Sequence, residues 1–310
     1  MTKLLTFSSI TALSLLFTSA CVDLGADPDD TGGLPVPEEG DYVPRDTPPT
    51  EAEQLAEMEL RARLVADIDP TRWPGYVAEG TARFVTPSGE VDEGGSEPTV
   101  EMANGDGILV LADGRKFRHR REVFEREVGL GRPSEVDRTR SVIGTDTRTA
   151  AAYTDYTKYP WRATGAILSK KTDTAGWCTA AMIGPRLALT AGHCVYDKDK
   201  NAWNWNIWFS PGHRGTGADR FPNGTPRQVI GLYSFTGWSE DENTQHDVGF
   251  LILADAPSTA SLGWFGFTSI WDASDHEGIT ATTLQYPGWN WTCADSPDPS
   301  GQCMAFQYRG

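Results

Sequence analysis

Short apolar segments alternate with turn residues over the C-terminal half of the chain, from about Ser141 onward. Glycine, proline, asparagine and aspartate separate the apolar runs, of which the clearest are 166–168, 180–183, 205–209 and 248–253. Runs of this length at this spacing are typical of antiparallel strands joined by tight turns. The pattern therefore predicts an antiparallel barrel or sandwich for this half of the chain.

A helical pattern lies upstream of this half. Residues Thr50 to Glu53 have the form of a capping box, in which the threonine and the second glutamate satisfy free backbone donors. The apolar residues that follow recur near the spacing of one helical face: Leu55, Met58, Leu60, Leu64 and Ile68. The pattern predicts a helix from about Glu51 to Ala66 that ends before Pro70.

A small mixed segment, from about Arg72 to Arg140, follows the helix. The run Gly107–Leu111 followed by Asp113-Gly114 predicts a strand that enters a tight turn. We interpret the basic run from His119 to Arg121 as a solvated face, and we expect no residue of this segment to carry chemistry. Arg138-Thr139-Arg140 is a candidate processing point.

The N-terminus has the pattern of an export signal. Lys3 precedes a moderately apolar stretch, 4–17, that is too short for a membrane-spanning helix. Thr18-Ser19-Ala20-Cys21 follows and resembles the cleavage site of bacterial lipoproteins, in which the cysteine receives a lipid. We therefore predict a lipoprotein-type signal peptide over 1–20, with an ordinary signal peptide as the alternative.

The formal charge of −16 is concentrated near the N-terminus. Residues 22–60 contain twelve acidic residues against Arg45 as the single basic one. This composition cannot bury enough apolar surface to offset the entropy of ordering, so 21–50 is predicted to be an acidic, Pro/Gly-rich tether. The charge also argues against a nucleic-acid partner, because nothing would neutralise the phosphates.

Export makes the five cysteines interpretable, since disulfides persist outside the cytoplasm. Assigning Cys21 to a lipid leaves Cys178, Cys194, Cys293 and Cys303, for which three pairings are open.

The strongest chemical signal surrounds His193. The apolar run Leu187–Thr190 leads into Ala191-Gly192, which presents His193 next to Cys194. A bond from Cys194 back to Cys178, sixteen positions earlier, would join two strands beside the histidine and hold a general base on rigid structure. A bridge between Cys293 and Cys303 would then close a small loop. A lone histidine near a strand end is more often structural.

A second signal is Asp247, which stands before the apolar run Val248–Leu253 and 54 residues after His193. A carboxylate there is costly to bury unless it is paired and hydrogen-bonded. The alternative is an ordinary turn aspartate that begins a strand. We interpret the neighbouring His246 as a bystander at a partly exposed strand start.

The segment Thr190-Ala191-Gly192-His193-Cys194 resembles the catalytic histidine motif of the chymotrypsin-like (trypsin-like) serine peptidases. That resemblance implies an all-β fold, a chymotrypsin-like double antiparallel β-barrel, here with the second barrel incomplete. It implies His193 as the general base and Asp247 as the residue that accepts a hydrogen bond from its imidazole.

Finer motifs resemble one branch, the bacterial glutamyl endopeptidases of the staphylococcal V8 type. These motifs are Val142–Asp146 with Arg148, Tyr159–Arg162, Ile183–Pro185, Thr190–Asp197, Phe209–Gly212, Gly263–Gly266 and Tyr286–Gly288. The resemblance implies a propeptide-like region over 51–140 and a protease domain over 141–310. Cleavage after Arg140 or Ser141 would release an α-amino group near the substrate pocket, and a preference for glutamate is implied.

The nucleophilic serine of that family has no counterpart in this sequence. No glycine-x-serine-glycine turn follows Asp247, and the nearest candidate, Ser300 before Gly301, lacks the preceding glycine. We interpret Ser300 as part of a polar surface loop. The expectation is a protease domain truncated at its C-terminus and inactive as written.

Two functions from different classes remain open at this point. The first is an exported serine endopeptidase precursor that acts on proteins or peptides, zymogen-like and touching the membrane only through a lipid on Cys21. The second is an inactive protease-fold surface lipoprotein that binds peptides or proteins. We expect no cofactor and no metal, because the five histidines are scattered and no CxxC pair occurs. Trypsin-like or broad specificity is the alternative to glutamate preference.

Overall fold

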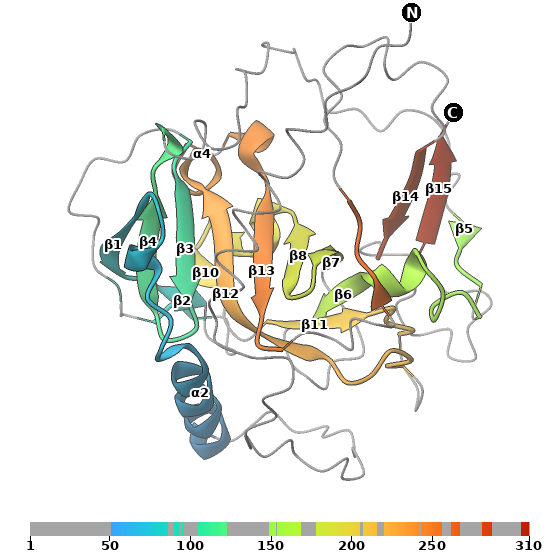
Figure 1. The fold of residues 1–310 in the computed structure, drawn as a ribbon, viewed down its shortest axis with the longest axis horizontal. Coiled ribbons are helices and arrows are strands. Elements are labelled where there is room, and N and C mark those ends of the chain that lie inside the picture. The colour runs from blue at the N-terminus through green and yellow to red at the C-terminus, as the bar shows by residue number, and fades with distance from the viewer. Residues whose placement is uncertain are drawn as a thin grey trace, which may run out of the picture.

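Six antiparallel strands close into a barrel at the centre of the computed structural model (Figure 1). Their order is β12, β11, β6, β7, β8 and β13, and β13 pairs back onto β12. Their bounds are β6 Thr164–Leu168, β7 Cys178–Gly184, β8 Leu187–Thr190, β11 Trp208–Pro211, β12 Arg227–Phe235 and β13 Gly249–Leu253. The structure confirms the antiparallel β class and decides between the two predicted architectures in favour of the barrel.

The structure describes residues 51–85, 90–92, 95, 105–122, 149–152, 154–168, 178–204, 207–215, 220–241, 243–255, 262–266, 281–286 and 305–309. The predicted signal peptide, tether and processing point lie outside these ranges, as do Cys21, Cys293, Cys303 and Ser300. Among the helices in the described ranges, none is both long and apolar enough to cross a membrane.

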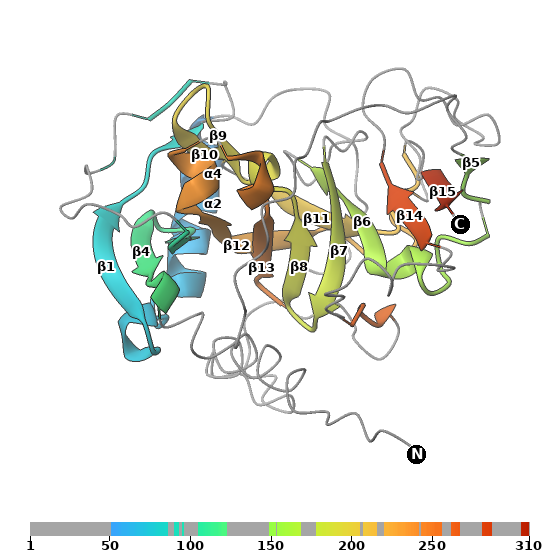
Figure 2. The ribbon, with the colours of Figure 1, turned by 90° about the horizontal axis from the view of Figure 1, so that it is seen from above.

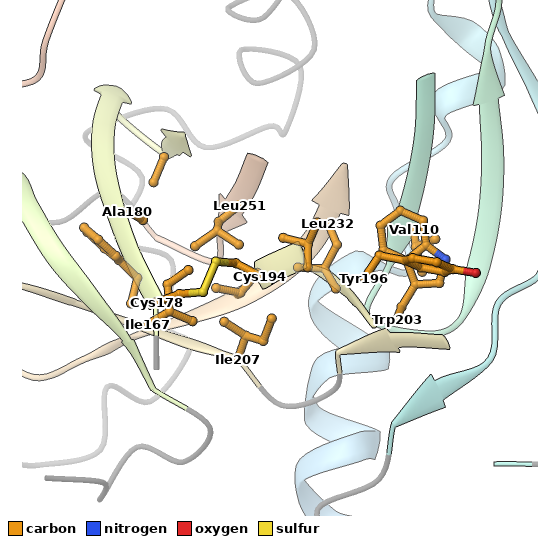
Figure 3. Packing of buried hydrophobic residues seen from close by; sticks show 14 of the residues in the cluster. Val110, Ile167, Cys178, Ala180, Cys194, Tyr196, Trp203, Ile207, Leu232 and Leu251 are labelled. Carbon is orange, nitrogen blue, oxygen red and sulfur yellow. A yellow bond between two sulfur atoms is a disulfide. The ribbon is translucent and has the colours of Figure 1, made fainter. Parts of the chain in front are cut away.

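The barrel interior is filled by side chains from alternate strand positions. On β7, Cys178, Ala180 and Met182 are buried while the residues between them are partly exposed, which is the period of two that a half-buried strand requires. Figure 3 shows Ile167 and Leu251 packed around the Cys178–Cys194 disulfide. The predicted apolar runs therefore lie in the barrel core.

Residues 51–122 extend the barrel sheet at one side. They form α2 Glu51–Val65, η1 Pro70–Arg72, β1 Tyr76–Thr81, β2 Phe84–Val85, β3 Gly107–Leu111 and β4 Arg115–His119. β3 pairs with β12, β4 with β3, and β1 with β4. β2 lies beside β10 (Ala202–Asn204), which also pairs with β9 (Tyr196–Asp197). In Figure 2 these N-terminal strands lie at one end of the molecule.

A second sheet lies at the opposite end of the molecule (Figure 2). It contains β14 (Ala281–Gln285), β15 (Ala305–Arg309) and β5 (Thr149–Ala150), in the order β14, β15, β5. The described residues contain no second closed barrel, so the incomplete second barrel of the expected fold stays a prediction.

The helix predicted over 51–66 is present as α2, but its buried face differs from the predicted apolar stripe. Leu60 was expected to be buried and is 48% exposed, whereas Arg61 is buried with its guanidinium over the ring of Trp208 on β11. Val65 and Ile68 are buried on the same face. The long arginine side chain can cover apolar surface, which a count of apolar residues alone does not anticipate.

The strand and turn predicted at 107–114 are confirmed. β3 ends at Leu111, and Gly114 takes a left-handed backbone conformation in the turn that leads to β4. The interpretation of the basic run 119–121 as a solvated face is wrong for His119, which is only 5% exposed. His119 stacks on Tyr76, so the neighbouring edge strand β1 covers it.

Candidate active site

His193 lies in a tight turn at the end of a barrel strand. β8 ends at Thr190, Ala191 is still extended, and Gly192 to Cys194 form the short 3-10 turn η3. Cys194 points into the core, where it is bonded to Cys178 on β7, as the sequence spacing suggested. The preceding side chain in the turn, that of His193, is 57% exposed. One buried and bonded neighbour therefore fixes the backbone that presents the histidine.

Asp247 lies at the start of the neighbouring strand. It follows the 3-10 turn η4 (Thr244–His246) and precedes β13. β13 runs antiparallel to β8, with Gly249 opposite Thr190. The beginning of β13 therefore meets the end of β8, which brings together two residues that are 54 positions apart.

The two side chains form a bidentate contact. Nδ1 of His193 lies 2.9 Å from Oδ2 and 3.2 Å from Oδ1 of Asp247. The backbone N–H of His193 also donates to Oδ1, at 2.8 Å. An ionised carboxylate can only accept hydrogen bonds, so the proton of the neutral imidazole is on Nδ1 and the lone pair is on Nε2. Nε2 is the ring nitrogen on the side away from Asp247.

Asp247 is largely removed from water, since its side chain is 12% exposed. The two donors on His193 satisfy a charge that would otherwise be costly at this depth. Asp247 therefore has a ring partner on the turn at the end of β8, in addition to its position at the start of β13. The structure thus brings both candidate residues together at one end of the barrel.

Trp238 packs against the turn η3, which carries His193. It lies in the short helix α4 (Thr236–Ser239), is buried, and has its ring centroid 6.2 Å from that of His193. A Cβ on Gly192 would lie 2.8 Å from Cδ1 of Trp238 and 3.1 Å from Oδ1 of Asp247. Glycine is therefore required for the close approach of turn, tryptophan and carboxylate. Nothing in the sequence indicated Trp238, because the residues that it contacts, Gly192 and His193, lie far from it along the chain.

Hydroxyl groups on the adjoining strands fix the two strand ends. Thr190 Oγ1 donates to the carbonyl of Thr179 at 2.7 Å, which ties the end of β8 to β7. Ser234 Oγ donates to the carbonyl of Val248 at 3.0 Å, which ties the residue after Asp247 to β12. These bonds lie beside the pair and restrict its separation.

The ring of His246 packs beside α4, with its centroid 6.3 Å from that of Phe235. Its ring lies against Gly237 on α4, where a Cβ would come within 1.6 Å of Nδ1. Burial lowers the pKa of His246, and Arg121 lowers it further, while Asp241 acts in the opposite direction. The neutral, half-buried ring is a packing element, in line with its interpretation as a bystander to the pair.

A metal could in principle be held by His193 with the two neighbouring cysteines, because their ligand atoms lie within 4.8 Å of one another. The sulfur atoms of Cys178 and Cys194 are bonded to each other, so neither is a thiolate. Metal binding by cysteine requires the thiolate form. This donor set does not fit a metal while the disulfide is intact.

Comparisons with known proteins place this barrel in a family. Residues 149–292 match the family model described as Trypsin. A glutamyl endopeptidase of Bacillus licheniformis is 36% identical over 149 residues, which is 48% of this chain and 43% of that protein. An extracellular metalloprotease of Bacillus subtilis (strain 168) is 34% identical over 149 residues, 47% of this chain and 45% of that protein. The chain thus spans under half the length of these curated relatives.

Solved structures were also compared. A Glu endopeptidase in complex with MPD has a TM-score of 0.43 at 21% identity, over 55% of this chain and 70% of that one. The VesB protease of Vibrio cholerae has a TM-score of 0.34 at 16% identity, over 52% of this chain and 43% of that one.

The antiparallel barrel and the family match agree with each other. Residues 149–292 match the Trypsin model, and a closed antiparallel barrel is consistent with the fold of the chymotrypsin-like serine peptidases, which this part of the chain resembles. Within that family the chain is related to a glutamyl endopeptidase, the branch that the sequence motifs indicated.

Proposed function

We propose that this domain belongs to an exported serine endopeptidase in which His193 is the general base and Asp247 orients it. The observation that carries the proposal is the contact between Nδ1 of His193 and the largely buried carboxylate of Asp247, at 2.9 and 3.2 Å, on a histidine side chain that is 57% exposed. This is the arrangement that proton transfer at a strand end requires, and it has no evident structural purpose for the barrel core.

The chemistry follows from the two ring nitrogens. Nε2 of His193 removes the proton from a serine hydroxyl as its oxygen attacks the carbonyl carbon of a peptide bond. The imidazolium that forms keeps its second proton on Nδ1, where Asp247 stabilises it. Nε2 then gives its proton to the departing amine, which leaves an acyl-enzyme that water hydrolyses by the same proton transfers in the same order.

The serine that this mechanism requires is not identified in these 310 residues, in which no glycine-x-serine-glycine turn occurs after Asp247. The proposal is therefore that this stretch supplies base, orienting carboxylate and one complete barrel. The nucleophile and the oxyanion donors would come from the segment that completes the second barrel. Loss of a single oxyanion donor costs about a hundred- to a thousand-fold in rate, so this stretch alone should be inactive.

The test begins by sequencing the gene past the codon for Gly310 and expressing whatever open frame follows. The extended protein should react with a serine-directed fluorophosphonate, and the His193→Ala variant should lose both labelling and peptide hydrolysis. Asp241→Asn, a change at an acidic residue of the turn after α4, is the control and should leave both intact. A stop codon directly after Gly310, or labelling that survives His193→Ala, would contradict the proposal.

A second candidate is a binding protein with a protease fold. The observation that favours it is the same absence of a recognisable nucleophile turn in the sequence. In that case the 310-residue chain should bind peptides with an affinity that His193→Ala leaves unchanged, because a binding surface has no use for a base. Retention of a paired histidine and aspartate favours the enzyme.

The finer proposals concern substrate and location. Glutamate preference rests on the V8-type motifs and on the glutamyl endopeptidase relative, and paired peptides with glutamate or lysine before the scissile bond would test it. Export with a lipid on Cys21 rests on the N-terminal pattern, and mass spectrometry of the mature N-terminus, with Cys21→Ala as control, would test it. Processing after Arg140 or Ser141 would show in the same spectra.

A further inference from the structure

The N-terminal segment is part of the barrel sheet, and this changes what its removal would mean. β12 pairs with β11 only at Arg227 and Gln228 on one edge. From Gly231 to Phe235 that edge is free of β11, and β3 pairs with it residue by residue, from Leu111 to Gly107. A strand from outside the family match therefore completes an edge of the catalytic barrel.

The contact between the two parts has the character of a protein interior. All five residues of β3 are buried, with Leu109 and Leu111 each 2% exposed. One continuous apolar cluster combines residues of the segment with residues of the barrel: Val65, Ile68, Leu109, Leu111 and Phe117 with Leu187, Ile230, Tyr233 and Phe250. Interfaces this apolar are typical of permanent association, whereas interfaces that open and close are more polar.

The side chain of Tyr233, on β12, lies against the hairpin that β3 and β4 form. The ring of Tyr233 lies over Gly107, where a Cβ would come within 1.6 Å of its hydroxyl oxygen. That oxygen lies 3.4 Å from Nδ1 of the buried His119 on β4. Burial raises the pKa of Tyr233 well above its usual value, so the phenol stays neutral beside a neutral imidazole. The tyrosine thus fills a space that only glycine at position 107 leaves open.

One further strand pairing attaches the segment to the rest of the protein, and a set of hydrogen bonds within the segment holds its own elements together. β2 lies parallel to β10, with Phe84 opposite Trp203. At the helix, the guanidinium of Arg115 donates to the carbonyls of Val65 and Ile68, at 2.6 and 2.8 Å, and so joins the end of α2 to the hairpin. The segment is therefore held as one body with helix, hairpin and β2 each in contact.

The segment also contacts the element that supports His193. The backbone N–H of Thr236 donates to the carbonyl of Asp106 at 2.8 Å, and the N–H of Gly105 donates to Thr236 Oγ1 at 2.9 Å. Thr236 is the first residue of α4, whose Trp238 packs against Gly192 and His193. The start of the hairpin thus fixes the helix that stands behind the catalytic turn.

We propose that residues 51–122 are a permanent light chain of this protein, which stays bound without a covalent link when the connection over 123–148 is cleaved. A propeptide that leaves would expose the free edge of β12 and the apolar cluster beneath β3, and both are liabilities for aggregation. The proposal concerns association alone, so it holds whether or not the domain hydrolyses peptides.

The experiment is to cut the connection in the intact chain. A recognition sequence for a site-specific protease replaces residues 133–139, and the purified protein is cleaved and passed over a size-exclusion column at micromolar concentration. Both fragments should elute together at the position of the uncut protein and separate only in denaturant. Elution of the fragments apart, or precipitation of the barrel fragment alone, would overturn the proposal.

A pair of variants identifies the interface. Gly107→Ala places a methyl group where the Tyr233 hydroxyl lies, so the cleaved variant should release its N-terminal fragment at least ten times faster than the cleaved parent on dilution. Leu60→Ala, on the exposed face of α2, is the matched control and should not change the rate. Equal release from both variants would show that β3 is not the site of attachment.

Discussion

At the scale of single residues, the site depends on the absence of a side chain at Gly192 and on the hydrogen bonds that Asp247 accepts. Gly192 lets Trp238 and Asp247 approach the turn, and Asp247 receives two hydrogen bonds from one residue, His193. Each of these roles can be tested by adding one methyl group or by removing one charge.

Asp247→Asn should change the state of His193. The amide retains the shape of the carboxylate but loses its charge and can present a donor to Nδ1, so the imidazole would favour the tautomer that protonates Nε2. In the 310-residue chain, the NMR signal of the Nδ1 proton should be lost. In the serine endopeptidase proposed above, kcat should fall by on the order of 10⁴-fold. An unchanged Nδ1 signal would contradict the assigned pair.

Gly192→Ala should destabilise the fold, because the new Cβ would lie 2.8 Å from Trp238 and 3.1 Å from Asp247. Overpacking of this kind costs about 1–3 kcal/mol. Urea unfolding followed by tryptophan fluorescence measures it. Gly266→Ala is the matched control, since no atom lies within 4 Å of the added Cβ. Equal stability of the two variants would show that the turn accommodates the added methyl group without strain.

At the scale of elements, strands with apolar runs were predictable and their partners were not. The apolar runs at 166–168, 180–183 and 249–253 lie in β6, β7 and β13, because strands that are buried continuously, as β6 and β13 are, or at alternate positions, as β7 is, leave a local apolar pattern. The pairing of β3 with β12 joins residues more than a hundred positions apart, and no local pattern carries it.

The candidate site divides in the same way. His193 and Asp247 could be found because each stands beside an apolar strand, and the antiparallel pairing of those strands makes them meet. Trp238 could not be found, since its role depends on the packing of α4 against η3. His119 was misassigned because its burial comes from Tyr76 and Tyr233, on strands that the sequence does not link to it.

Burial of His119 on β4 predicts a loss of stability in acid. Desolvation lowers the pKa of His119 from 6.5 to about 4, against the opposing effect of Asp106. The unfolded chain therefore binds a proton between these pH values that the folded chain does not. The contribution is complete above about pH 6.5 and is lost as the pH falls toward 4, by up to about 3 kcal/mol.

Urea unfolding at pH 7 and at pH 4.5 measures this dependence. The parent protein should lose more stability between the two values than His119→Gln, because glutamine does not titrate. Carboxylates contribute equally to both proteins, so the difference isolates the histidine. Parallel losses in the two proteins would show that His119 is protonated in the fold.

At the scale of the whole molecule, two regions with different sequence character share one core. Residues 51–122 contribute α2, β1, β3 and β4, and the region that matches the Trypsin model contributes the six-stranded barrel. The apolar cluster that contains Leu109 and Tyr233 crosses the boundary between them. Unfolding of these parts should therefore be one event.

Leu109→Ala tests this cooperativity. The change removes a side chain that is 2% exposed and should cost about 2–5 kcal/mol. Tryptophan fluorescence should report the shift in a single transition, since ten of the eleven tryptophans lie in the other region and only Trp73 lies in the N-terminal one. Leu60→Ala should change the free energy of unfolding by less than about 0.5 kcal/mol. Two separate transitions, with only the first one shifted, would show that the regions unfold independently.

Because β12 pairs with β3, β11 and β13, the choice of N-terminal boundary decides whether a recombinant fragment retains all the partners of this strand. The family match begins at residue 149, but a recombinant fragment that begins there would lack β3 and leave half of a central strand without its partner. Such a fragment would expose Ile230 and Tyr233 to the solvent, so its yield of soluble protein from the host cell should be low. A fragment that begins at Glu51 would retain the whole sheet, so the useful boundary lies about a hundred residues upstream of the one that similarity suggests.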